Sequence, residues 1–214
     1  MSDPGYLTVA RPARAEIEVK RSRFICDLVR VETEEEARDV IERVRAGSRE
    51  ARHHCTAFIL GADGATQRSN DDGEPSGTAG APMLEVLRGR HLRDVVAVVT
   101  RWFGGTLLGT GGLIRAYGDA VTAAVDAATL VRREQRAVVG LTVSHATAPR
   151  LENALRTHSG VTVTDTAYAA RDVTLTVAVA PDDLEDVRAL VAELSSGGAA
   201  LVDLGTEWVD VPTT

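Results

Sequence analysis

Hydrophobic and polar positions in the first part of the chain follow two different periods. Residues 15–31 alternate with a period of two, which predicts a pair of strands joined by a tight turn. Thr33 and Glu36 have capping-box spacing, and the apolar positions that follow recur every three or four residues until a glycine. We therefore expect a helix over 33–47 and then a buried strand at Cys55–Leu60.

Two glycine-rich segments interrupt this pattern in the middle of the chain. The first, Ser69–Gly80, has neither a helical nor a strand period, and so long a loop inside a compact domain is usually functional or disordered. A short helix at Pro82–Leu87 and a strand buried on both faces at Asp94–Thr100 follow. The second segment, Arg101–Gly112, leads into a helix over 113–128. The apolar face of that helix is predicted to comprise Ile114, Tyr117, Val121, Ala124, Val125 and Ala128.

The last third of the chain forms a separate pattern. Its apolar periods predict the order β-α-β-β-α-β, which is that of a ferredoxin-like split βαβ unit. About 75 residues suit one such unit, so we expect two domains, over 1–136 and 137–214, in an α+β protein. The expected strands are 138–143, 161–166, 173–180 and 199–211, and the expected helices are 148–158 and 181–194.

Composition and charge restrict the class of protein. The apolar fraction of 44% and charged fraction of 26% are those of a folded globular chain, which excludes global disorder. The net charge is −7, but residues 1–136 carry 20 basic and 20 acidic side chains. Residues 137–214 carry four Arg and 11 acids, so the negative charge makes only the C-terminal domain a poor partner for nucleic acid.

The sequence also predicts the cellular location, the state of the cysteines and whether a zinc site can form. The start, MSDPGYLTVA, lacks the features of a signal peptide, and the longest apolar run, Val95–Val99, is too short to span a bilayer. Two cysteines, Cys26 and Cys55, make no disulfide framework, so we expect a cytoplasmic protein with buried, reduced thiols. His53, His54 and Cys55 are adjacent on a strand and cannot converge on zinc.

The first glycine-rich segment combines carboxylates with hydroxyl groups. Its acids are Asp71, Asp72 and Glu74, and its hydroxyl side chains include Ser76 and Thr78. These acids could hold a divalent cation, cap a helix, or form an ion pair with Arg101 or Arg115 in the second segment. Because the spacing of a calcium-binding loop is missing, we predict no metal site.

The second segment places glycines before a helix N-terminus, where free N–H groups favour an anion. It matches neither a Walker P-loop nor a dinucleotide fingerprint. A phosphate ligand, structural turns and a macromolecular contact all remain open, and we identify no catalytic constellation and no cofactor. The candidate binding residues of the two segments are Asp71, Asp72, Glu74, Ser76, Thr78, Arg101, Gly104, Gly105, Gly111, Gly112 and Arg115.

Two long motifs resemble the IMPACT/YigZ family. They are D-D-G-E-P-S-G-T-A-G-A-P-M-L at 71–84 and V-V-T-R-W-F-G-G-T-L-L-G-T-G-G-L-I-R-A-Y at 98–117. The strings S-R-F-I at 22–25 and R-H-H-C-T-A-F at 52–58 also look like that family. Trp102 departs from a common Tyr, and His54 replaces a common amide. The C-terminal segment is similar to the small domain appended in bacterial members.

The resemblance implies both a fold and a field of function. The N-terminal domain would be an α/β domain like the second domain of a small-subunit ribosomal protein, with an exceptional left-handed βαβ crossover. The C-terminal domain would look like the fifth domain of elongation factor G. Eukaryotic members regulate translation initiation, and a translation or nucleic-acid role is suspected for bacterial members. The kinase-regulating activity of the eukaryotic proteins is not expected here.

Three hypotheses follow from the residues and the resemblance. The first is a non-enzymatic, translation-associated regulatory protein that contacts RNA, the ribosome or a translation factor through its N-terminal domain, with Arg101, Arg115 and the helix ends. The second is a small-molecule binding protein or enzyme, with a site for a phosphate- or nucleotide-containing ligand between 69–80 and 101–112. The third is that both motifs only stabilise the crossover.

Overall fold

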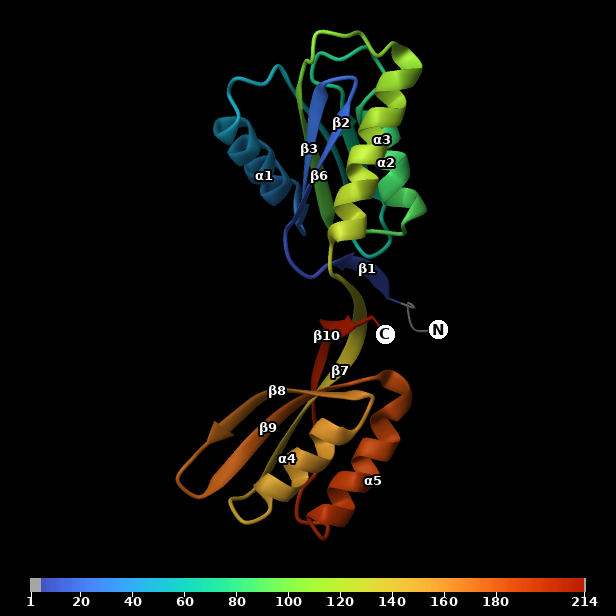
Figure 1. Cartoon of the computed structure of the whole chain (residues 1–214). Coiled ribbons are helices and arrows are strands. Elements are labelled where there is room, and N and C mark those ends of the chain that lie inside the picture. Colours follow the sequence, from blue (N-terminus) through green and yellow to red (C-terminus); the bar gives the residue numbers. More distant parts are fainter. Residues whose placement is uncertain (1–4, 214) are drawn as a thin grey trace. The chain divides into compact units, whose positions relative to one another are not determined.

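A computed structural model describes residues 5–213, which divide into two units (Figure 1). The N-terminal unit comprises 5–132 together with 210–213, and the C-terminal unit comprises 133–209. Each unit has its own sheet and its own apolar core, and the two are described separately. The two-domain α+β fold expected from the sequence is confirmed. No helix in the described part of the chain is long and apolar enough to cross a membrane.

The N-terminal unit is built on a five-stranded sheet in the order β2-β3-β6-β4-β5. Strands β3 and β4 are both antiparallel to β6, which lies between them, so they run parallel to each other and the chain joins them by a βαβ crossover. The handedness of that crossover stays a prediction. The strands are β2 (Ala13–Val19), β3 (Ser22–Arg30), β4 (His53–Leu60), β5 (Thr66–Asn70) and β6 (Val95–Trp102), preceded by β1 (Tyr6–Val9).

Three helices cover the two faces of this sheet (Figure 1). Helix α1 (Glu34–Gly47) lies on one face, and helices α2 (Gly80–Gly89) and α3 (Thr110–Ala127) lie on the other. The expected cap of α1 is present, since the Thr33 hydroxyl accepts a hydrogen bond from the Glu36 N–H. Apolar side chains on alternate positions of β6 enter the two cores, which is why its apolar run is nearly continuous.

Two details of the expected secondary structure were wrong. Ser69 and Asn70 belong to strand β5 rather than to a loop, because their backbone pairs with β4 although the segment T-Q-R-S-N shows no apolar alternation. Helix α3 begins at Thr110, and Ile114, expected on its buried face, is 42% exposed. The predicted Tyr117, Val121, Ala124 and Val125 are buried, and Leu113, Ala116 and Ala120 complete the buried stripe.

The C-terminal unit has the predicted β-α-β-β-α-β order. Its strands belong to a five-stranded sheet in the order β1-β7-β9-β8, in which β10 also pairs with β7. Helices α4 and α5 lie side by side on one face of the sheet, and their leucines and valines fill the core against β7 and β9 (Figure 1). Residues 181–183 form a 3-10 turn, so α5 begins later than expected. The elements are β7 (Leu130–Ser144), α4 (Ala148–Thr157), β8 (Val161–Tyr168), β9 (Asp172–Val179), α5 (Leu184–Leu194) and β10 (Val202–Pro212).

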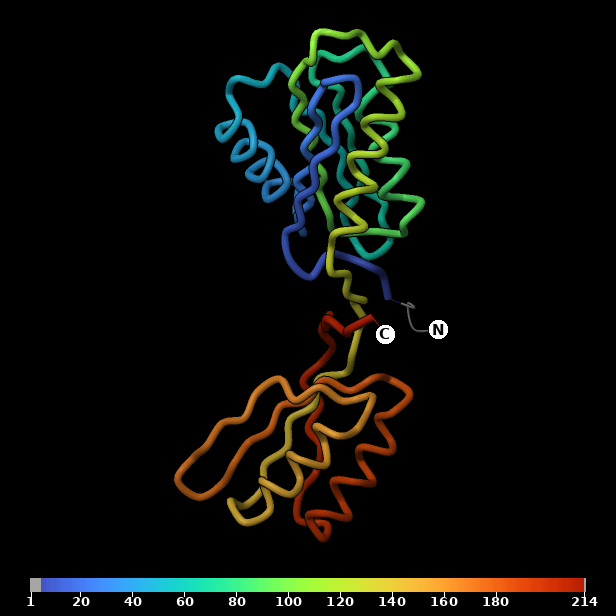
Figure 2. The backbone as a smooth tube through the Cα atoms, viewed as in Figure 1, coloured from blue at the N-terminus to red at the C-terminus, as the bar shows by residue number. Residues whose placement is uncertain are grey.

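A close backbone approach holds the second glycine-rich segment in place. After β6 the chain crosses the end of the sheet and turns into α3 (Figure 2). There Gly104 lies against the turn between β2 and β3, and its N–H donates to the Ser22 hydroxyl over 3.1 Å. A Cβ at Gly104 would overlap the backbone of Arg21 and Ser22. This glycine is therefore required by packing.

Candidate functional site

The carboxylate of Asp71 organises the start of α2. It accepts hydrogen bonds from the N–H groups of Gly77, Ala79 and Gly80, over 2.8, 3.0 and 2.8 Å. These groups include free donors at the helix N-terminus, where a negative charge is favourable. Partial burial acts to raise the pKa of Asp71, but the three backbone donors outweigh it and hold this pKa below its ordinary value. Asp71 is thus a cap and a loop support.

The lowered pKa of Asp71 predicts a pH-dependent stability. Its folded-state pKa is depressed, so its contribution is present above the ordinary carboxyl pKa and disappears as the pH falls through the folded value. We expect Asp71→Asn to be less stable than the wild type at pH 6. Between pH 6 and about pH 3, the urea concentration at its unfolding midpoint should fall by less than that of the wild type. Asp63→Asn, at a carboxylate that accepts from the single Ala65 N–H, is the control. Equal pH dependence in the wild type and Asp71→Asn would contradict the assignment.

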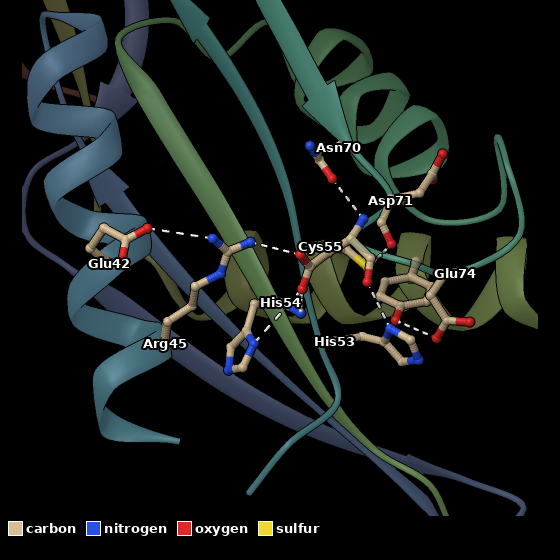
Figure 3. A network of polar contacts seen from close by, with 10 residues as sticks. Glu42, Arg45, His53, His54, Cys55, Asn70, Asp71 and Glu74 are labelled. Atoms are coloured by element: carbon tan, nitrogen blue, oxygen red, sulfur yellow. Dashed lines mark hydrogen bonds and ion pairs between the residues drawn. The ribbon is translucent and has the colours of Figure 1, made fainter. Parts of the chain in front are cut away.

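Asp72 connects its loop to α1 and β4 through its side chain and backbone, and Figure 3 shows its partners Arg45, His53 and His54. Its carboxylate accepts from Arg45 of α1 and from the backbone N–H of His54, each over 2.7 Å. Its own carbonyl oxygen lies 2.8 Å from Nδ1 of His53. Because a carbonyl only accepts, Nδ1 carries a proton, and Nε2 of the neutral ring is left as an acceptor. Asp72 therefore sets the orientation and the tautomer of His53.

Glu74 is almost fully buried and forms an ion pair with Arg101. Its Oε1 lies 2.6 Å from Nη1 of Arg101, and the two side chains are 3% and 8% exposed. The Tyr117 hydroxyl of α3 donates to the same oxygen over 2.8 Å. Of the two partners considered for the acids of the first motif, Arg101 is the one found. The carboxylate thereby anchors the guanidinium at the end of β6.

Cys55 is buried, and its thiol contacts the first motif. Its Sγ donates to the Asp71 carbonyl over 3.0 Å, and the side chain is buried. Burial is the main reason that the pKa of Cys55 rises to about 12, and burial also raises the pKa of Tyr117. A thiol with so high a pKa stays protonated at neutral pH, so it lacks the reactive thiolate form. Cys26 is likewise buried.

The acids of the first motif face different partners rather than one another. Asp71 faces the N-terminus of α2, Asp72 faces α1 and β4, and Glu74 faces Arg101. Among residues 5–213, no three His, Cys, Asp or Glu side chains gather in a way that could hold a metal ion. The carboxylates act in positioning the loop and its neighbours.

The other predicted site residues differ in exposure. Thr78 is 1% exposed, and its hydroxyl donates to the Pro75 carbonyl, whereas Ser76 lies on the surface. Gly105 has a φ of 86°, which favours glycine, and a Cβ at Gly112 would approach Leu108 closely. Gly111 has an ordinary φ and open space around it, so neither backbone conformation nor packing requires a glycine at this position. Arg115 is exposed on α3, away from the acids of the first motif.

A pocket of about 220 Å³ opens where β4 and β6 end, and we call it the Arg52 pocket. His53 and Arg101 are directly opposed in the antiparallel register of these strands, so their side chains are neighbours on one face. Phe103 is 51% exposed and Leu107 is 82% exposed. The pocket is lined by Arg52, His53, Arg101, Phe103 and Leu107. It combines basic groups with exposed apolar surface.

A second pocket, of about 300 Å³, lies between α3 and the turn after β2, and we call it the Lys20 pocket. Its lining includes Lys20 and Arg115 and one acid, Asp119. Leu107 lines the Arg52 pocket and Leu108 lines the Lys20 pocket, so the loop over 103–109 contributes to both. Within residues 5–213, Lys20, Arg52 and Arg115 make no ion pair.

The sequence motifs led to only part of this site. Arg101 and Arg115 were predicted, and both line a pocket. Arg52, His53, Phe103, Leu107 and Lys20 were not among the candidates. A run of basic residues before a strand, R-H-H-C, was visible in the sequence, but the register that places His53 opposite Arg101 was not.

The geometry defines a class of protein before any comparison. It is a two-unit α+β protein whose N-terminal unit carries two basic pockets beside one glycine-rich loop, with the acids of the first motif turned inward. Residues 20–125 match the family model of the Impact N-terminal domain, and residues 141–197 match a domain of unknown function, DUF1949. The chain belongs to the IMPACT family.

Individual proteins similar to this chain support its membership of the family. The IMPACT family member YvyE of Bacillus subtilis is 46% identical over 151 residues, which are 71% of this chain and 70% of that protein. The family member YigZ of Escherichia coli is 45% identical over 130 residues, which are 60% of this chain and 64% of that protein. A crystal structure of a hypothetical protein is 36% identical with a TM-score of 0.62, covering 94% of this chain and 97% of that one.

Proposed function

We propose that this protein is a non-enzymatic, translation-associated regulatory protein that binds RNA through its N-terminal unit. Membership of the IMPACT family supports the field of translation, because the resemblance implies that the eukaryotic members, to which the chain is 34–35% identical over 93–95 residues, regulate translation initiation. The RNA would be bound in the cytoplasm, as part of the ribosome or together with a translation factor. No catalytic constellation is part of the proposal.

The observation that carries the RNA contact is the surface around the loop over 103–109. Lys20, Arg52 and Arg115 are basic side chains without an acidic partner, placed in two pockets on this loop. Such groups neutralise phosphates, and an exposed aromatic ring such as Phe103 offers a stacking face for a base. Arg101 adds donors but little net charge, because Glu74 balances it.

The C-terminal unit has the opposite character. Residues 137–214 carry four Arg against 11 acids, which repels a phosphate backbone. RNA is therefore assigned to the N-terminal unit. The acidic C-terminal unit is suited to a separate contact with a basic ribosomal protein.

A second function, as a small-molecule enzyme with its site between the two motifs, has less support. The three acids that such an enzyme would use for proton transfer or cation binding are engaged by backbone N–H groups, Arg45 and Arg101. Neither pocket has a carboxylate of the first motif in its lining. The binding function is the better supported of the two.

The salt dependence of RNA binding tests the proposal. If three basic side chains each neutralise one phosphate of a single strand, the slope of log K against log salt should be about −2. Each of Lys20→Ala, Arg52→Ala and Arg115→Ala should reduce that slope by about 0.7 in filter binding to ribosomal RNA fragments. Arg38→Ala, which removes an exposed arginine of α1, is the charge-matched control and should leave the slope unchanged.

Sedimentation with ribosomes provides the second measurement. The wild type should co-sediment at low salt, and the triple variant at Lys20, Arg52 and Arg115 should stay in the supernatant. Co-sedimentation that is unaffected by the triple variant would place the contact elsewhere. An absence of salt-dependent affinity for any RNA would overturn the RNA contact.

A further inference from the structure

We propose that the Arg52 pocket binds one nucleoside monophosphate unit, with the phosphate on Arg52 and Arg101 and the base on Phe103. The inference rests on the proposed RNA contact and specifies what one part of that surface recognises. The unit could be supplied by an RNA strand or by a free nucleotide, since both present a phosphate beside an aromatic base.

The donors of Arg101 that remain unpaired indicate where the phosphate binds in the pocket. One of its donors, Nη1, is held by Glu74, and its buried Nε has no hydrogen-bond partner in the described structure. A guanidinium has five N–H donors in a fixed plane, so one carboxylate oxygen orients the group without using it up. Arg52 is exposed and has no acidic partner, so it supplies the net positive charge that the Arg101–Glu74 pair lacks.

The base end follows from Phe103. The guanidinium carbon of Arg101 lies 5.7 Å from the centre of this ring, on one face, while half of the side chain remains exposed. Phe103 is therefore not a core residue. An exposed face of an aromatic ring can stack on any base. Leu107, which is more exposed still, adds apolar surface to the lining of the pocket.

His53 belongs to the same lining and lies directly opposite Arg101 in the register of β4 and β6. Its Nδ1 is occupied by the Asp72 carbonyl, and Gly73 lies against the same edge of the ring without a side chain. In the neutral ring Nε2 is then an acceptor, in a lining that otherwise supplies donors and apolar surface. A ligand with a hydroxyl or amino group next to its phosphate, such as a nucleotide with its ribose hydroxyl groups, matches that pattern.

The size of the pocket sets the size of the ligand. Its volume of about 220 Å³ is below the roughly 300–1,000 Å³ of pockets for drug-sized molecules. This volume excludes an enclosed dinucleotide cofactor and limits the ligand to a small unit.

Isothermal titration calorimetry on the full chain tests the proposal with four probes: CMP, AMP, cytidine and inorganic phosphate. A second series uses a short single-stranded RNA. The monophosphates should bind at least tenfold more tightly than cytidine or phosphate. Arg52→Ala should weaken monophosphate or RNA binding about tenfold or more, and Phe103→Leu roughly fivefold or more. Phe103→Tyr should restore binding, and Arg38→Ala should not affect it.

Both mutated positions are exposed, so equal urea midpoints will show that the variants are folded. Monophosphate binding that responds to both variants supports the inference and identifies a free nucleotide as sufficient. RNA binding that responds to both, without monophosphate binding, supports it with the strand as the source. RNA binding that responds to Arg52→Ala but not to Phe103→Leu overturns this inference and leaves the proposed function standing. RNA binding that responds to neither variant overturns this inference and also contradicts the role of Arg52 in the proposed function. Monophosphate binding without RNA or ribosome binding overturns the proposed function alone, and binding of no probe overturns both.

Discussion

Replacing Glu74 with alanine will destabilise the N-terminal unit by about 3–5 kcal/mol. The substitution leaves the Arg101 guanidinium, 8% exposed, without its carboxylate, and it removes the acceptor of the Tyr117 hydroxyl. A buried charge that has lost its partner keeps its full desolvation cost. Removing one partner of a buried ion pair therefore lowers the free energy of unfolding by more than the intact pair contributes to it. Urea denaturation followed by circular dichroism measures the loss.

A double-mutant cycle separates this effect from simple loss of packing. Glu74→Met combined with Arg101→Met replaces both charges by flexible apolar chains, and it should cost less than either Glu74→Met or Arg101→Met alone. The exposed pair of Arg38 and Glu34 provides the control, and breaking it should change stability by less than about 1 kcal/mol. Additive losses in the Glu74–Arg101 cycle would contradict the coupling.

Gly104→Ala will be the other severe substitution, with a loss of about 3 kcal/mol in the free energy of unfolding. Its Cβ would occupy the space of backbone atoms of Arg21 and Ser22. Backbone cannot rotate away as a side chain can, so the turn after β2 or the loop after β6 must shift. Because Arg21 has a φ of 66°, that turn already has a conformation with little freedom to adapt.

Gly111→Ala is the matched control for this prediction. It lies in the first turn of α3 in open space, so alanine there should raise stability by up to about 1 kcal/mol. Urea midpoints of the two variants should therefore move in opposite directions. If Gly104→Ala is as stable as the wild type, the close approach of the loop to the turn is not maintained in solution.

The first motif shows how far residue chemistry could be interpreted without the fold. A cation site, a helix cap and an ion pair to an arginine of the second motif were all open for its carboxylates, and the structure shows a cap at Asp71 and the ion pair at Glu74. Residue types could not distinguish a ligand-binding acid from a positioning one, because both need the same carboxylate. The direction of each side chain decided this, and that direction depends on which strand and helix lie beside the loop.

The sequence by itself determined the domain order, the strands and helices with strong apolar periods, and the family, because periodicity and motif spacing are local properties of the chain. It also located the negative charge in the last third. Only the tertiary structure decided that His53 faces Arg101 and that Phe103 stays exposed. The register of β4 against β6 joins residues almost fifty positions apart, and such pairing is set by the packing of the whole sheet.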